Sequence, residues 1–327
     1  MLALFAACTT AFYGLLMQNP GWMVDIDTLY HYRVASLIRT RGPWVDIDWL
    51  PYTILGARGT DHEWLFHLLI APLTALGDGF ESVMFACAAT GAAVVTALYA
   101  LLRGAAVPYA ALFAVAAIVG ADMLPERFIA LRAQDIAVVL AFAALLAIAR
   151  NRNVLLALTA FVFTQSYHAV VLLGVLLVLT LASAWLLERG RSLRPVIAVA
   201  GGVLLGLVAS PWFPANVGYL VFHTFFKAAE GSATLYGEEW FPTPWASVLR
   251  DAWRAHAMLA GGLAAAAYAW RRDGSWRPAP ETLAALAMAP ITLFMYHFAN
   301  RFAEYYVPFA VLATALLWRD AWRGTPP

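Results

Sequence analysis

One short stretch near the start of the sequence concentrates side chains that can do chemistry. Residues 25–33 read Asp-Ile-Asp-Thr-Leu-Tyr-His-Tyr-Arg, and they follow the apolar run 2–18 closely. Charged groups beside an apolar segment of membrane-span length are costly unless they face water, pair with one another or bind a ligand. We therefore interpret this stretch as one half of a site that polar segments later in the chain complete.

Three carboxylates in two of these polar segments are candidates for catalysis and for a cation site. Asp27 belongs to the opening stretch, and Asp122 and Glu126 stand close together in a later one. Hard divalent cations prefer carboxylate oxygens, so three such groups are chemically able to hold one Mg²⁺ or Mn²⁺ ion if the fold brings them together. The alternative is that the acids are solvated, or that they pair with Arg127 and Arg132.

Arginines that flank apolar runs are candidates for binding phosphate, because the guanidinium offers a forked set of donors. Arg301, in a short polar turn, is the main candidate, and Arg132 and Lys227 are weaker ones. Two alternatives exist for Arg301. It can pair with Glu304 one helical turn later, or it can reach from a helix end toward the lipid headgroups.

The remaining candidates for contact with a substrate occupy polar segments on the same predicted side. They are Tyr30, His31, Arg33, His168 and Glu239. Each has a structural alternative. His31 and Arg33 can orient the loop that contains them, His168 can be a hydrogen-bonded interfacial side chain, and Glu239 can be a solvated loop charge.

The composition predicts that membrane helices hold these groups in place. The chain is 62% hydrophobic and 13% charged, whereas about 25% of residues are charged in a typical soluble domain. Long apolar runs recur from end to end, so we predict an all-α integral membrane protein. The formal net charge of +1 gives no indication of nucleic-acid binding. Cys8 and Cys87 both lie in apolar runs, which argues against a disulfide framework or a cysteine metal site.

We predict about ten transmembrane helices. Several runs hold only about 15 residues, or roughly 23 Å of helix, and a hydrocarbon core is roughly 30 Å thick. Local thinning of the bilayer or broken helices around a cavity would accommodate them. Because the first run lacks a basic segment and a cleavage site, we expect it to be retained rather than removed as a signal peptide. The predicted spans are 2–18, 80–102, 107–121, 135–149, 153–167, 169–187, 195–210, 253–270, 281–298 and 304–318.

The run 62–76 decides the predicted topology. Its polar residues crowd one end, and if it crossed the membrane the arginine-rich loops would fall on the wrong side of the first loop. As a helix lying on the membrane surface, it leaves those arginines on one side, which the positive-inside rule makes cytoplasmic. Both termini are then cytoplasmic, as in a multi-pass protein of a bacterial inner membrane.

The external side then carries most of the candidate residues. Its segments are 19–79, 122–134, 211–252 and 299–303. Within the first, the spacing of apolar residues predicts a helix over 28–40, which Arg41-Gly-Pro43 ends, followed by an irregular segment and the surface helix. We expect a single transmembrane domain over 1–327, with no soluble C-terminal domain.

The stretch 27–33 resembles the Asp-x-x-x-x-x-Arg element that follows the first span of oligosaccharyltransferase catalytic subunits, archaeal members above all. The similarity extends to a long first external loop with two surface helices, to the segment 64–72 before the second span, and to an acidic second external loop. It covers roughly the first 135 residues. These subunits belong to the GT-C glycosyltransferases, which use sugars linked to polyprenyl phosphate.

The resemblance implies an integral membrane glycosyltransferase whose donor is a polyprenyl-phosphate-linked sugar on the extracytoplasmic face. Asp27 matches the family's first-loop catalytic aspartate, and Asp122 and Glu126 match its second-loop acidic pair. That pair is usually separated by one residue, whereas here the acids are four apart. Residues 1–327 also contain no Trp-Trp-Asp-Tyr-Gly run. Transfer to an asparagine sequon is therefore not expected, and the acceptor is left open.

The residue types suit this chemistry. Displacing a polyprenyl phosphate requires positive charge on the leaving phosphate, from a divalent cation or from an arginine such as Arg301. A hydroxyl acceptor needs a base, and a carboxylate serves. Two other classes remain open: a transporter or flippase for lipid-linked cargo, which would place ionisable groups near the bilayer midplane, and a non-catalytic GT-C-like subunit.

Overall fold

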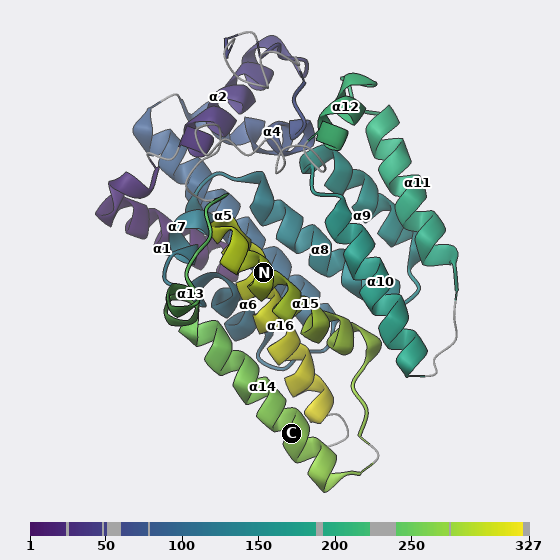
Figure 1. Cartoon of the computed structure of the whole chain (residues 1–327). Helices are drawn as coiled ribbons and strands as arrows, with labels where there is room; N and C mark the ends of the chain where they lie inside the picture. Colours follow the sequence, from purple (N-terminus) through teal and green to yellow (C-terminus); the bar gives the residue numbers. More distant parts are fainter. Residues whose placement is uncertain are drawn as a thin grey trace.

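The computed structural model describes residues 1–23, 26–47, 49–50, 60–77, 79–187, 192–222, 240–274 and 276–322. Within these ranges all regular structure is α-helix or 3-10 helix, and no strand occurs. The prediction of an all-α fold is therefore confirmed. Figure 1 shows the helices gathered into one bundle, with α2 and α4 lying across its upper end.

Each predicted apolar run coincides with a helix. These helices are α1 Leu2–Gln18, α5 Phe80–Gly104, α6 Ala110–Val119, α8 Ala133–Ala149, α9 Asn153–Ser166, α10 Val171–Leu186, α11 Arg194–Val208, α14 Trp253–Arg272, α15 Pro280–Phe298 and α16 Ala303–Ala321. The other helices belong to the connections. They are α2 Ile26–Arg41, α4 Trp64–Ile70, α7 Leu124–Ile129, α12 Ala215–Val221 and α13 Trp245–Asp251, with 3-10 turns at Pro20–Met23, Ala71–Leu76 and Asn300–Phe302.

Helix length and composition support fewer membrane spans than the sequence predicts. In the described part of the chain, one helix is both long and apolar enough to cross a bilayer, namely α5 with 25 residues. Shorter apolar helices of 10–17 residues accompany it, among them α1, α6 and α8. Length and composition therefore support one span, whereas the apolar runs of the sequence predict about ten.

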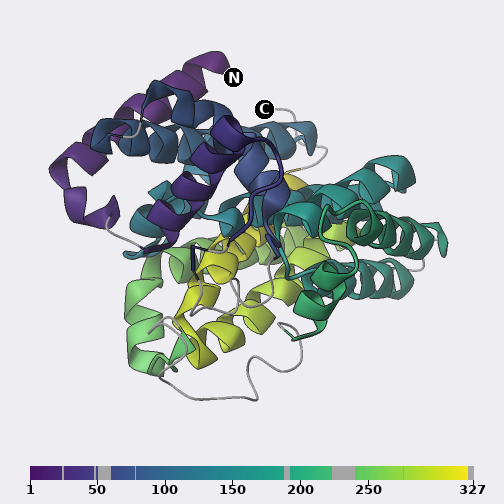
Figure 2. The same ribbon diagram turned by 90° about the horizontal axis from the view of Figure 1, so that it is seen from above.

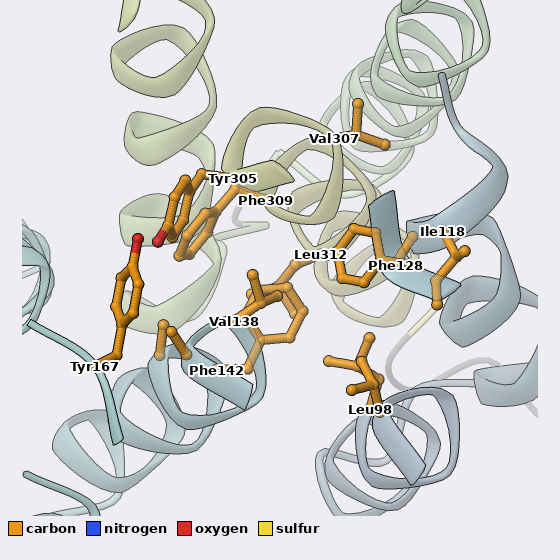
Figure 3. Packing of buried hydrophobic residues seen from close by; sticks show 14 of the residues in the cluster. Leu98, Ile118, Phe128, Val138, Phe142, Tyr167, Tyr305, Val307, Phe309 and Leu312 are labelled. Carbon is orange, nitrogen blue, oxygen red and sulfur yellow. The ribbon is translucent and has the colours of Figure 1, made fainter. Parts of the chain in front are cut away.

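The helix α16 forms the centre of the bundle. It is buried along almost its whole length and packs against α14, α15 and α6. Phe309 on α16 meets Phe142 on α8 edge to face, with ring centres 5.3 Å apart (Figure 3). Aromatic pairs prefer this geometry. A rigid α16 in turn fixes the position of the polar turn that precedes it.

The helices α9 and α11 approach each other closely through two glycines spaced four residues apart. A Cβ atom at Gly202 would lie 2.3 Å from the carbonyl oxygen of Ala157, and one at Gly206 would lie 2.8 Å from Thr164 Cβ. A larger residue does not fit at either position. Small residues in this spacing let helix backbones pack directly, as is common between membrane helices.

Polar connections collect at the end of the bundle where α2 and α4 lie, which Figure 2 views from above. The side chain of Thr28 on α2 accepts a hydrogen bond of 3.2 Å from the backbone N–H of Leu131, between α7 and α8. The hydroxyl of Tyr32 donates to the carbonyl oxygen of Gly77 at 2.5 Å. These bonds fasten the first polar segment of the chain to the bundle.

The opposite end of the bundle holds a buried ionic network between the end of α16 and the start of α15. Arg319 Nη2 lies 3.0 Å from Glu281 Oε1, and Arg319 Nε donates to Asp320 Oδ1 at 2.8 Å. The second oxygen of Asp320 accepts from the backbone N–H of Ala279 at 2.8 Å and from the hydroxyl of Thr282 at 2.5 Å. This network ties two neighbouring helices together.

Candidate functional site

A layer of charged side chains links three separate polar segments at the α2 end. Asp27, in the first turn of α2, is 48% exposed, and its Oδ2 lies 3.8 Å from Arg132 Nη2. Arg132 Nη1 also donates to Glu304 Oε1 at 3.4 Å, and Arg127 Nε donates to the same oxygen at 2.7 Å. The buried carboxylate of Glu304 thus has two guanidinium partners, which offset the cost of its burial.

The other two predicted carboxylates do not join Asp27. Asp122 Oδ1 lies 2.5 Å from Arg254 Nη1, and its backbone N–H donates to the carbonyl oxygen of Asp251. Glu126 is exposed. In the described ranges, the groups of three or more possible metal ligands do not include Asp27, Asp122 and Glu126 together.

The cation site predicted from these three carboxylates is therefore not formed in this structure, and local geometry explains why. Asp122 precedes the short helix α7, whose first turn contains Pro125, whereas Glu126 lies within that helix. Successive residues of a helix point about 100° apart. As a result Arg127 is directed inward to Glu304, while Glu126 faces outward.

Arg301 borders an apolar cavity. It lies buried in the 3-10 turn between α15 and α16, and its guanidinium stands 4.5 Å from the centre of the Trp240 ring. The cavity measures about 250 Å³, and its wall includes apolar side chains of α10 and α15. Tyr167, His168 and Tyr305 also line it, and the hydroxyls of the two tyrosines point toward each other (Figure 3). The cavity therefore has a largely apolar wall and is bordered by the guanidinium group of Arg301.

A second group of polar side chains is centred on Glu63. We refer to this group as the Glu63 cluster, and its members are Asp61, His62, Glu63, His67, His31 and His168. Its inner half is a chain of hydrogen bonds. His67 Nδ1 lies 2.7 Å from Asp61 Oδ2, His67 Nε2 lies 2.7 Å from His31 Nδ1, and Asp61 Oδ1 accepts the backbone N–H of Glu63 at 3.0 Å. The carboxylate of Asp61 thereby orients the His67 ring.

The carboxylate of Glu63 has imidazoles on both sides. Its Oε2 lies 3.7 Å from His31 Nδ1, whereas its Oε1 lies 3.6 Å from His62 Nε2 and 3.8 Å from His168 Nδ1. Two groups of three residues have ligand atoms that all lie within 4.8 Å of one another: His31, Glu63 and His67, and His62, Glu63 and His168. These residues come from three segments far apart in the sequence.

The burial of this end changes the protonation behaviour of α2. Burial lowers the pKa of His31 well below its usual 6.5, and the nearby His67, His62 and Arg132 lower it further. Burial also raises the pKa of Tyr30 well above 10, and the carboxylates of Asp61 and Glu63 add to the effect. Near neutral pH, His31 is therefore a neutral imidazole and Tyr30 keeps its phenolic proton.

The predicted residues fall into three sets. Asp27 and Arg132 meet in the charged layer, Tyr30, His31 and His168 belong to or adjoin the Glu63 cluster, and Arg301 borders the cavity. Arg33 is exposed on α2. Glu239 and Lys227, which were also candidates for contact with the substrate, lie outside the described residues.

Sequence reasoning missed two important carboxylates. Glu304 entered only as a possible partner of Arg301, yet its carboxylate binds Arg127 and Arg132. Glu63 entered only as one polar residue at the end of an ambiguous run. The spacing of Glu63 and His67, four residues apart, was an available signal, because residues at this interval share one face of a helix.

A comparison of the chain with models of known protein families found no match, and a comparison with curated proteins found none either. The function is therefore inferred from the residues and their geometry.

Proposed function

We propose that the protein is an integral membrane glycosyltransferase that takes a sugar from a polyprenyl-phosphate carrier at the α2 end of the bundle. The observation that carries the proposal is the cavity of about 250 Å³ between α10 and α15. Its apolar wall suits isoprenoid units, and the buried Arg301 suits a phosphate at its polar end. A lipid phosphate is a ligand that needs both features in one site.

In this proposal the ten helices that coincide with the predicted apolar runs span the membrane, with both termini in the cytoplasm. Apolar side chains that face outward from several helices support the proposal, because a bilayer would cover them. Examples are Leu112 on α6, Leu158 on α9, Val178 on α10, Leu204 on α11 and Phe294 on α15. The helices α2 and α4 then lie at the extracytoplasmic surface, where a lipid-linked sugar and its acceptor can meet.

Asp27 serves as the base in the proposed reaction. It takes the proton of an acceptor hydroxyl as that oxygen attacks the anomeric carbon, and the bond from this carbon to the carrier phosphate breaks. Arg301 stabilises the departing phosphate. The guanidinium of Arg132, 3.8 Å from Asp27 Oδ2, faces the carboxylate that accepts the proton. Arg301 thus supplies the positive charge for which the sequence offered either a divalent cation or an arginine.

Transfer of a labelled sugar by the purified protein in nanodiscs tests the proposal. A panel of polyprenyl-phosphate and polyprenyl-diphosphate sugars serves as donor. We expect turnover with at least one donor, and we expect Asp27→Asn to slow it by at least about 100-fold, which is what removing a general base costs. Asp251→Asn is the matched control, since Asp251 pairs with Arg250 and lies outside the proposed site. Absence of transfer from every donor, or full activity of Asp27→Asn, contradicts the proposal.

A flippase for lipid-linked cargo is the main alternative, because the same cavity would suit its substrate. Its ionisable groups would line a path across the bilayer, whereas Asp27, Arg132 and Arg301 lie at one end of the bundle. Movement of a fluorescent polyprenyl-phosphate sugar across vesicles that contain the protein, without any transfer reaction, would favour that alternative.

A further inference from the structure

The outer half of the Glu63 cluster has the spacing of metal ligands rather than of hydrogen bonds. Two ligands of a tetrahedral Zn²⁺ ion, each about 2.1 Å from it, are roughly 3.4 Å apart. Glu63 Oε1 stands 3.6 Å from His62 Nε2 and 3.8 Å from His168 Nδ1, so shifts of a few tenths of an ångström would seat an ion. The inner pair differs, because His31 and His67 stand at the hydrogen-bond distance of 2.7 Å.

A small cavity lies beside these ligands. It measures about 20 Å³, and His62, His168, Asp61 and Asn216 are among the residues that line it. A cavity of roughly 10–15 Å³ measured with a water-sized probe holds one water molecule. There is consequently room for one ion, or for an ion whose bound water occupies the remaining space.

Asn216 gives an independent indication of what this cavity takes. Its amide nitrogen donates to the carbonyl oxygen of Leu207 at 2.9 Å, which fixes the orientation of the side chain. Its Oδ1 is buried and has no hydrogen-bond partner among the described residues. A buried acceptor without a donor costs free energy. A cation or a metal-bound water would satisfy this oxygen.

The inner half of the cluster supports the ligands from behind. Asp61 holds both the His67 ring and the backbone N–H of Glu63, and His31 lies 3.7 Å from the second oxygen of Glu63. Groups that orient metal ligands in this way are typical of real metal sites. The Glu63 carboxylate is therefore held in a fixed direction beside His62 and His168, which line the small cavity.

We propose that His62, Glu63 and His168 bind one divalent transition-metal ion, and that Zn²⁺ is its best chemical match. Two imidazoles and one carboxylate suit zinc, and three protein ligands leave a fourth position open to water or to Asn216 Oδ1. The ion joins the segment before α4 to the connection between α9 and α10. His168 also lines the cavity that Arg301 borders, but the inference does not depend on the proposed glycosyltransferase activity.

Zinc binding by the purified full-length chain tests the inference without any donor or acceptor. The protein in detergent is stripped with a chelator and titrated with Zn²⁺, and bound metal is counted by mass spectrometry. We expect about one zinc per chain and a rise in the unfolding midpoint of roughly 5 °C at saturating metal. Addition of Co²⁺ to the stripped wild-type protein should give the intense visible absorption of a four-coordinate ion.

Variants then locate the ion. Replacing His168→Ala, Glu63→Gln or both His62→Ala and His168→Ala should weaken zinc binding by at least about 100-fold. His297→Ala is the control, since His297 binds the carbonyl oxygen of Thr243 and lies outside the cluster. Zinc uptake by the wild-type chain no greater than that of the double variant overturns the inference. Zinc retained by the double variant but lost in His31→Ala overturns the assignment of the ligands.

Discussion

The two ends of the helical bundle both bury charged groups, but they treat them differently. At the α15–α16 end, Arg319 and Asp320 are hydrogen-bonded on several sides, and the donors include backbone groups and Thr282. At the α2 end, Asn216 Oδ1 and Glu304 Oε2 have no hydrogen-bond partner among the described residues. Asp27 there is half exposed and two cavities are present.

This difference separates a structural role from a chemical one. A buried charge whose partners are all supplied by its own protein holds helices together, and it has nothing left to offer a ligand. A buried acceptor without a donor, beside an empty space, is set for a group that comes from outside. If burial of charged groups were the only criterion, the two ends would be equally good candidates for a functional site.

Breaking the satisfied network should have the largest effect on stability. Arg319→Ala leaves Glu281 and Asp320 buried without their cation, and removal of one partner from a buried pair costs about 3–5 kcal/mol. We expect a large fall in the free energy of unfolding, measured by thermal unfolding in detergent. Arg319→Lys keeps the charge and should lose less. A stability equal to that of the wild-type chain would show that this end is not the structural one.

At the other end, Arg301→Gln should change ligand binding more than stability. Loss of a charge-assisted hydrogen bond to phosphate costs about 1.5–3 kcal/mol, which corresponds to a rise in KM for the lipid-linked donor of roughly 10- to 100-fold. The unfolding midpoint should stay within a few degrees of wild type. Steady-state kinetics over a range of donor concentrations measure the effect. A changed midpoint with an unchanged KM would make Arg301 a structural residue.

A milder change sharpens the comparison at the small cavity. Asn216→Leu removes the buried oxygen that has no partner, so we expect zinc affinity to fall by about 10-fold and the stability of the metal-free protein to change little. Competition between the protein and a fluorescent zinc chelator gives the affinity. If the metal-free variant is strongly destabilised while zinc affinity is kept, then Asn216 acts through its bond to Leu207 instead.

The smallest effect is expected at Arg33. This arginine belongs to the stretch that the sequence singles out, but it is exposed on α2. Substitution of an exposed side chain outside special features changes stability by no more than about 0.5 kcal/mol. Arg33→Ala should therefore leave both the unfolding midpoint and the KM for the donor near their wild-type values. A clear rise in KM would restore Arg33 to the substrate site.

The helices were predictable from the sequence because apolar runs alternate with polar or glycine- and proline-containing turns. The predicted helix 28–40 and the predicted surface helix 62–76 correspond to α2 and to α4 with its 3-10 extension. Arg301 was also placed correctly in a turn between two helices. These features depend on local periodicity, which a single sequence contains.

The proximity of Asp27 to Arg132 was one of the alternatives that the sequence offered, but the other partners of the charged groups were not predictable. Asp122 binds Arg254, more than a hundred residues later, and Glu304 binds Arg127 and Arg132 at a similar distance in the chain. Such pairs depend on how the helices pack, and the spacing of charges along the chain does not reveal that packing. Residues 122–134 were expected to form a loop, but part of this segment is the short helix α7. This helix directs Arg127 inward and leaves Glu126 exposed.

The contact between α9 and α11 has a consequence for the small cavity. Because Gly202 and Gly206 leave no side chain between the two backbones, these helices pack in direct contact. The end of α9 leads to His168, and the end of α11 leads to Asn216. The close contact reaches the cavity itself, because Thr164, which Gly206 approaches, is one of its lining residues. The cavity wall is thereby preorganised, so an incoming cation would meet ligands that are already in place.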